Sequence, residues 1–212
     1  MPPSTANGDP VTKLARSDNK NKADWAISFG SAMRFRGCRP AFDVLVEPGQ
    51  DFYPPAQRQE IDRISEDIYG PVNNGVYRAG FATSQQAYDE AVTKLFSKLD
   101  DLDQLLGMQR YLVGDRITEA DWRLFTTLVR FDPVYVTHFK TDRKRISDYA
   151  NLAPYLRELY QVSGVSDTID MGSLRAHYFQ SHRHFNPHWI VSAGPEFDLD
   201  QPHSRDLAFP KI

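Results

Sequence analysis

The chain has 212 residues, which is enough for one sizeable domain or two small ones, and 41% of them are apolar. Its formal net charge is −3, so neither a nucleic acid nor an anionic membrane is expected as a partner. No apolar run reaches about 18 residues and none follows Met1, so we expect no membrane span and no secretory signal. The single cysteine, Cys38, excludes an internal disulfide and suits a reducing compartment, so a cytoplasmic location is expected by elimination.

The first 52 residues differ in character from the rest of the chain. Residues 1–24 are rich in Pro, Ser, Asn, Asp and Lys and poor in large apolar side chains. Because such a segment cannot bury enough surface to offset its ordering entropy, we expect it to be disordered. Residues 25–52 contain apolar side chains without a sustained period, which predicts an irregular lead-in.

Apolar residues then recur at helical spacing through residues 53–185. The first helix is predicted after Pro54-Pro55, since proline in a first turn loses no hydrogen bond. A bend or break is predicted at Gly70-Pro71. The second helix is predicted to begin at a cap formed by Thr83 and to carry an apolar stripe as far as Leu106.

The third predicted helix has the clearest start, at Thr118-Glu119-Ala120-Asp121. In this pattern the threonine oxygen faces the third helical amide and the aspartate reaches back to the threonine amide, which is a capping box. Thr118 and Asp121 are therefore assigned to the fold as a structural cap. The residues after the cap are apolar on nearly every side until Asp132-Pro133, which is typical of a helix in the middle of a bundle.

Two further helices are predicted at residues 151–162 and 173–183, and no alternating strand pattern follows residue 53. Residues 186–212 hold four prolines and few periodic apolar side chains, so they are expected to form an extended tail. The predicted fold class is all-α: a helical bundle at residues 53–185, with a disordered N-terminal segment and an extended C-terminal tail.

Four segments of this bundle carry a family resemblance. They read Asn-Asn-Gly-Val-Tyr-Arg-Ala-Gly-Phe-Ala-Thr at residues 73–83, Tyr-Leu-Val-Gly-Asp-Arg-Ile-Thr-Glu-Ala-Asp at 111–121, Leu-Phe-Thr-Thr-Leu-Val-Arg-Phe-Asp at 124–132, and His-Tyr-Phe at 177–179 with Ser-His-Arg at 181–183. On these segments the chain resembles the second, helical domain of the glutathionyl-hydroquinone reductases, a branch of the glutathione transferase superfamily. The resemblance implies the helical bundle of glutathione transferase C-terminal domains.

The resemblance also implies a chemistry. In the family, a thioredoxin-like first domain binds glutathione and presents a cysteine in a Cys-Pro-Trp motif. The thiolate attacks the sulfur of a glutathionyl-hydroquinone, releases the hydroquinone and leaves a mixed disulfide for a second glutathione. Glutathione is thus the implied cofactor, an aromatic quinol the implied small-molecule partner and a homodimer the implied assembly. Because the sequence contains no Cys-Pro-Trp, we expect the first domain to be absent and the chain to be catalytically incomplete, with a separate thioredoxin-like chain as a conceivable partner.

The resemblance assigns site residues as well. Tyr77 and Tyr178 match the two tyrosines that line the hydroquinone pocket in the family, where a phenol packs on the aromatic ring and hydrogen-bonds its oxygen. Cys38 lies between two arginines that would favour its thiolate, but an irregular lead-in lacks a glutathione-binding scaffold, so a catalytic role is not expected. No metal site is expected from the histidines near the end, because Asn186-Pro187 interrupts their helical spacing.

Two alternatives stay open beside the incomplete enzyme. The first is a non-enzymatic dimerisation or protein-interaction module, in which a former domain interface contacts a protein partner. The second is a complete transferase whose first domain is rebuilt from residues 1–52, which is short for a glutathione-binding unit.

Overall fold

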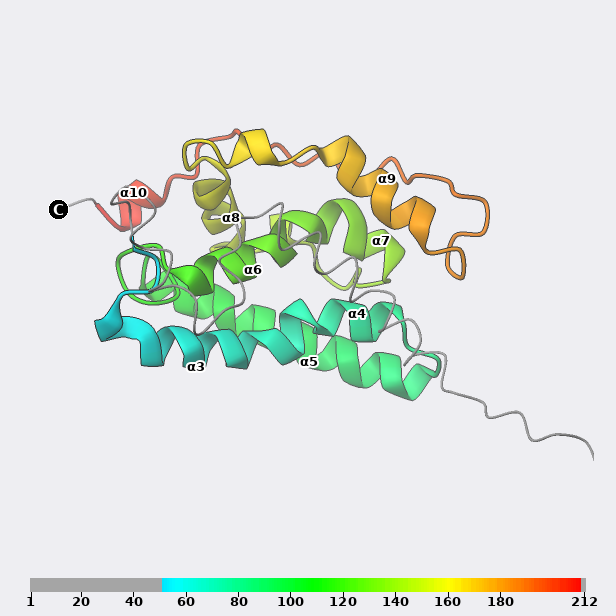
Figure 1. The fold of residues 1–212 in the computed structure, drawn as a ribbon, viewed down its shortest axis with the longest axis horizontal. Coiled ribbons are helices and arrows are strands. Elements are labelled where there is room, and N and C mark those ends of the chain that lie inside the picture. Colours follow the sequence, from blue (N-terminus) through cyan, green and yellow to red (C-terminus); the bar gives the residue numbers. More distant parts are fainter. Residues whose placement is uncertain (1–50, 211–212) are drawn as a thin grey trace, which may run out of the picture. The chain divides into compact units, whose positions relative to one another are not determined.

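The computed structural model describes residues 51–210, and every structural statement below concerns those residues. The expected disordered segment 1–24, nearly all of the expected lead-in at 25–52, and Cys38 lie outside the described residues. The described part consists of helices and connecting segments, with one isolated β-bridge between Tyr111 and Gly114 and no strand (Figure 1). This confirms the all-α prediction for residues 51–210.

The α-helices are α3 (Arg58–Ile68), α4 (Gly75–Gly80), α5 (Gln85–Met108), α6 (Glu119–Arg130), α7 (Val136–His138), α8 (Leu152–Tyr160), α9 (Met171–Ser181) and α10 (Arg205–Ala208). Between them lie the 3-10 turns η2 (Pro55–Gln57), η5 (Ile146–Asp148) and η6 (Ser166–Thr168), and the π-helices η3 (Tyr69–Asn73) and η4 (Phe131–Tyr135). Helices α4, α7 and α9 lie at one end of this helical unit and α10 lies at the other (Figure 1).

The two π-helices lie at Gly70-Pro71, where a bend or break was predicted, and at Asp132-Pro133, where the apolar run of the third predicted helix ends. A proline ring clashes with the carbonyl of the preceding helical turn, and a π turn relieves that clash because it holds an extra residue. The chain therefore continues from α3 through η3 into α4, which the sequence analysis missed, and from α6 through η4 into α7. As a result, Tyr77 lies on α4, before the point where the second helix was expected.

The longest helix, α5, buries seven side chains along one stripe, as its apolar period predicts. Its N-cap is Ser84, whose hydroxyl accepts a hydrogen bond from the Ala87 amide at 3.2 Å. The predicted cap, Thr83, is therefore wrong by one residue. Helix α6 is buried on most sides and begins at a capping box of Thr118 and Asp121, in which the Thr118 amide donates to the aspartate at 2.7 Å.

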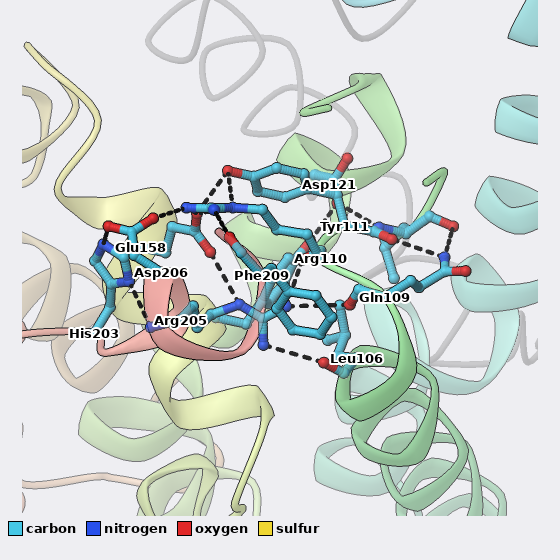
Figure 2. A network of polar contacts seen from close by, with 12 residues as sticks. Leu106, Gln109, Arg110, Tyr111, Asp121, Glu158, His203, Arg205, Asp206 and Phe209 are labelled. Carbon is cyan, nitrogen blue, oxygen red and sulfur yellow. Dashed lines mark hydrogen bonds and ion pairs between the residues drawn. The ribbon is translucent and has the colours of Figure 1, made fainter. Parts of the chain in front are cut away.

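The segment after α9 forms no helix until α10, whose first residue is inserted into the end of the bundle (Figure 2). The buried guanidinium of Arg205 donates to Glu158 at 2.9 Å and to the carbonyl oxygens of Leu106 and Gln109, both at 3.2 Å. These carbonyls belong to the C-terminal end of α5, which has no intrahelical donors left for them. Arg205 therefore ties the end of the chain to α5 and α8.

A second buried guanidinium joins the same carboxylate. Arg110 donates to Glu158 at 2.8 Å through Nε and to Asp206 at 2.5 Å, and the Tyr111 hydroxyl donates to Glu158 at 2.6 Å (Figure 2). Arg110, Glu158, Arg205 and Asp206 are called the charged cluster below. Since Glu158 accepts from both guanidiniums, this cluster pairs the two buried cations with one buried anion.

Candidate functional site

The two tyrosines expected to bind substrate lie together at the end of the bundle formed by α4, α7 and α9. The hydroxyl oxygens of Tyr77 on α4 and Tyr178 on α9 are 2.7 Å apart, so they are hydrogen-bonded. A third tyrosine, Tyr135 on η4, places its hydroxyl oxygen 3.0 Å from that of Tyr178 and 3.4 Å from that of Tyr77. These three residues are called the tyrosine cluster. Their hydroxyls come from three segments that are far apart in the sequence.

Close packing of α4 against Phe139 holds this cluster in place. The ring of Phe139, just after α7, stacks on Tyr135 with centroids 5.3 Å apart and planes only 7° apart. Phe139 rests directly on Gly80, where an added Cβ would lie 2.2 Å from the phenylalanine Cδ1. Glycine at position 80 therefore permits the approach of the ring on which Tyr135 is stacked.

The hydroxyls of Tyr135 and Tyr178 are held in their neutral form. Burial raises the pKa of Tyr135 well above its ordinary value, and the neighbouring phenols Tyr178 and Tyr77 add to the effect. Burial likewise raises the pKa of Tyr178, with a further contribution from Tyr77, while Arg130 acts in the opposite direction on both. Because a phenol that stays protonated keeps its O–H, each of these side chains is a hydrogen-bond donor at neutral pH.

A pair of imidazole rings lies next to the tyrosine cluster. Nε2 of His138 on α7 is 2.9 Å from Nδ1 of His182, and the ring centroids are 5.2 Å apart. These two residues are called the histidine pair. Burial lowers the pKa of His138 to about 4, and the charges of His182 and Lys140 would add repulsion. The pair is enclosed by aromatic rings, among them Phe139, Phe179 and Phe185.

His184 and His188 are exposed. Within residues 51–210, no group of three or more His, Cys, Asp or Glu side chains is arranged to hold a metal ion.

The capping aspartate of α6 has more partners than a cap requires. Besides Thr118, the buried carboxylate of Asp121 accepts from the Leu112 amide at 2.9 Å and from the Tyr155 hydroxyl at 2.8 Å. Burial raises the pKa of Asp121, although these hydrogen bonds act to lower it. Asp121 thus links the start of α6 to α8 and to the loop after α5, and it lies apart from the tyrosine cluster.

Sequence reasoning missed Tyr135 and His138. Both follow Asp132-Pro133, where the apolar run of the third predicted helix ends, and the segment that carries the resemblance ends just before them. Spacing offers a weak signal, because Tyr135, His138 and Phe139 are three and four residues apart and so share one face of a helix.

A surface groove of about 570 Å³ lies on another part of the bundle, between α3 and α5. Its lining includes Asp67, Arg78, Lys98 and Asp101, and Lys98 forms ion pairs with Asp67 at 2.9 Å and Asp101 at 3.7 Å. The charged lining does not suit an uncharged aromatic ligand, and none of the three tyrosines takes part in it.

Comparison with known proteins places this geometry in a class. Residues 85–158 match the protein family described as Glutathione S-transferase, C-terminal domain. This match spans α5 to most of α8 and includes Tyr135 of the tyrosine cluster.

Among similar proteins, the glutathionyl-hydroquinone reductase YqjG of Escherichia coli is 55% identical over 199 residues, which cover 94% of this chain and 60% of that protein. The glutathionyl-hydroquinone reductase PcpF of Sphingobium chlorophenolicum is 51% identical over 153 residues, covering 72% of this chain and 49% of PcpF. The chain is thus similar over most of its length to glutathionyl-hydroquinone reductases, and it spans about half to three fifths of the length of these curated relatives.

Solved structures agree. The glutathione-bound structure of YqjG has a TM-score of 0.77 at 58% identity and covers 80% of this chain and 55% of that one. A Xi class glutathione transferase from Natrialba magadii has a TM-score of 0.76 at 51% identity, covering 78% of this chain and 51% of that one.

The comparisons do not support the expected absence of a first domain. The 199-residue match with YqjG is longer than the described part of the chain, so it includes residues before position 51. In the part of the chain that the structure describes, no helix is long and apolar enough to cross a membrane.

Proposed function

We propose that this chain takes part in the glutathione-dependent reduction of glutathionyl-hydroquinones, and that the tyrosine cluster binds the aromatic quinol. The observation on which the proposal depends is the meeting of three phenol hydroxyls within 3.4 Å of one another among aromatic rings. Support also comes from the two relatives with this activity in their names.

The chemistry of the reaction suits neutral phenols. A thiolate attacks the sulfur of the glutathionyl-hydroquinone, a new S–S bond forms, and the bond between that sulfur and the ring carbon breaks. The bond breaks from the keto tautomer, in which the ring carbon that bears the sulfur has already taken up a proton. Its electron pair then stays with the ring as an enolate, so negative charge develops on the quinol oxygen until that oxygen is protonated. Tyr77 and Tyr178 can each donate a hydrogen bond to that oxygen, and a hydrogen bond to a charged acceptor is about twice as strong as one to a neutral acceptor.

Glutathione is the proposed source of reducing equivalents. Structures of YqjG and of the Xi glutathione transferase ECM4 from Saccharomyces cerevisiae hold glutathione. We propose that residues 51–210 alone bind the quinol without catalysing its release, because the chain's one cysteine, Cys38, lies outside them. A homodimer is proposed as well, from the resemblance stated above.

The proposal is tested with the purified full chain under anaerobic conditions. Binding of 1,4-naphthohydroquinone is measured by calorimetry, and reduction of its glutathionyl adduct is measured with excess glutathione. Tyr77→Phe and Tyr178→Phe should weaken binding by about three- to tenfold each, the usual size of one hydrogen bond. Tyr69→Phe is the matched control, because Tyr69 is 52% exposed and outside the cluster.

Three outcomes separate the alternatives. Saturable binding that weakens in both cluster variants but not in the control supports the quinol site. Turnover that disappears in Cys38→Ser would make Cys38 the nucleophile and contradict catalytic incompleteness. Absence of saturable binding in the wild type would contradict the proposal and favour the interaction module.

A further inference from the structure

The segment of η4 and α7 and the helix α9 are joined by two polar contacts that lie one helical turn apart. The first is the hydroxyl contact between Tyr135 and Tyr178 at 3.0 Å, and the second is the imidazole contact between His138 and His182 at 2.9 Å. Positions 135 and 138 are three apart on one side, and 178 and 182 are four apart on the other. Tyr178 lies on α9 and His182 is the residue that directly follows that helix, so the second contact ties the C-terminal end of the helix to the segment that the first contact already joins.

Helix α9 buries few of its side chains. Of its 11 residues it buries Leu174, Tyr178 and Phe179, while most of the others are exposed or half-buried. Apolar contacts are non-directional and allow a helix to turn or slide by small amounts. A hydrogen bond weakens steeply when its donor–hydrogen–acceptor angle departs from linearity. A second hydrogen bond four residues beyond Tyr178 therefore fixes both the rotation of α9 about its axis and its position along that axis.

We infer that the histidine pair is a positioning device for Tyr178, holding the phenol hydroxyl where it meets Tyr77. This inference rests on the quinol-binding function proposed above. The contact of the His182 ring with Tyr178, at 6.0 Å between centroids, places the pair directly beside the phenol that it positions.

Imidazole suits this task because a neutral ring has one N–H donor and one acceptor nitrogen. Two neutral rings can therefore form one directional hydrogen bond without a buried charge. The contacting atom of His182 is Nδ1, which lies close to where the side-chain nitrogen of an asparagine would be. His182→Asn should consequently keep the link that His182→Ala removes.

The first experiment needs no ligand. The full chain is labelled with ¹³C-tyrosine and the ring signals of Tyr77, Tyr135 and Tyr178 are assigned with single Tyr→Phe variants. His182→Ala should shift the Tyr178 signal and leave that of Tyr69 unchanged, and His182→Asn should return the signal toward its wild-type position. His188→Ala, at an exposed histidine beyond α9, is the control that should shift none of them. An unmoved Tyr178 signal in a folded His182→Ala variant would overturn the inference.

The second experiment asks whether the pair acts through Tyr178. His182→Ala should weaken binding of 1,4-naphthohydroquinone by about three- to tenfold, the size of one net hydrogen bond. In a Tyr178→Phe background the same substitution should change the affinity by less than about twofold, because the hydroxyl to be positioned is gone. An equal loss in both backgrounds would show a general loosening of the fold and would overturn the positioning role.

The two experiments also separate the inference from the function on which it rests. If the wild type does not bind the naphthohydroquinone, the quinol-binding function fails, and the tyrosine signals alone decide whether His182 positions Tyr178. If the wild type binds and Tyr178→Phe weakens binding but His182→Ala does not, the function stands and the positioning role fails.

Discussion

Two of the buried polar clusters in residues 51–210 differ in character, and the contrast between them indicates their roles. The tyrosine cluster and the histidine pair consist of phenol and imidazole groups at the α4–α7–α9 end, whereas the charged cluster lies where α10 meets α5 and α8 (Figures 1 and 2). Neutral hydroxyls can exchange one partner for another at modest cost, because each is protonated and has lone pairs to spare. Buried charges cannot exchange partners in this way, because an ion that loses its partner is left uncompensated in a medium of low dielectric constant.

The charged cluster is therefore suited to holding the chain end in place. Burial alone would lower the pKa of Arg110, but hydrogen bonds to Asp206 and Glu158 outweigh it and raise that pKa. Burial lowers the pKa of Arg205 although Glu158 opposes the effect. Both guanidiniums depend on the same carboxylate, so Glu158 is the residue whose loss the cluster tolerates least.

The largest effect we expect is from Glu158→Ala, which leaves two buried guanidiniums without their shared anion. Breaking a buried ion pair by removing one partner costs about 3 to 5 kcal/mol of unfolding free energy. Urea unfolding of the full chain, followed by far-ultraviolet circular dichroism, measures it. Glu60→Ala is the control, because its ion pair with Arg63 is solvent-exposed and should matter little. Equal stability of both variants would remove the distinction drawn between the clusters.

The second largest effect we expect is a loss of folding stability in acid, caused by protonation of His138. The pKa of His138 is lowered from 6.5 to about 4 by burial, so the unfolded chain binds a proton more readily than the folded chain. Stability contributed by the neutral ring is present above pH 6.5 and is lost as the pH falls toward about 4. The linkage slope of about 1.4 kcal/mol per pH unit sets an upper limit near 3 kcal/mol, and solvent screening reduces the expected loss to about 2.

The measurement is urea unfolding of the wild type and of His138→Gln between pH 4 and pH 7.5. Contributions from Asp121 and Asp132, whose pKa values burial raises, are common to both proteins and cancel in the difference. The variant should lose less stability on acidification than the wild type. Identical pH dependences would show that the imidazole of His138 is not buried in its neutral form.

Gly80→Ala tests the packing beneath the tyrosine cluster. Since the new Cβ would lie 2.2 Å from Phe139, the ring must shift and disturb the Tyr135 ring stacked on it. Overpacking of this kind costs about 1 to 2 kcal/mol, and quinol affinity should fall with it. Gly70→Ala is the matched control, because an added Cβ there meets nothing within 4 Å. The idea fails if the two variants have the same stability and affinity.

Much of the fold was predictable because its period is that of an α-helix. The apolar stripes in α3 and α5 are local patterns that mark the buried face of each helix, and the capping box of α6 is a local pattern that marks where that helix begins. The segments η3 and η4 were not predictable in this way. A π turn has a different period, and its proline is a helix breaker by every local rule, so only the packed structure shows that the chain continues through it.

The site was predictable only in part, for a related reason. Tyr77 and Tyr178 are 101 positions apart, and no local pattern brings them together, so their pairing came from a family motif. Tyr135 lies beyond the region that the motif covers. Arg205, in the segment expected to be an extended tail, reaches the end of α5 through contacts nearly 100 residues away. Long-range polar contacts of this kind leave no periodic signal in the sequence.

The smallest expected effect is from Tyr135→Phe, and it sharpens the comparison most. Removing this hydroxyl leaves Tyr77 and Tyr178 hydrogen-bonded to each other, so the free energy of unfolding should fall by only about 1 kcal/mol. Tyr155→Phe is the matched variant, because its equally buried hydroxyl donates to the carboxylate of Asp121 at 2.8 Å. A hydrogen bond to a charged group contributes about 1.5 to 3 kcal/mol, so this second variant should be the less stable in urea. If Tyr135→Phe costs as much as Tyr155→Phe, the hydroxyls of the tyrosine cluster are not free to exchange partners, and a ligand oxygen could not enter among them cheaply.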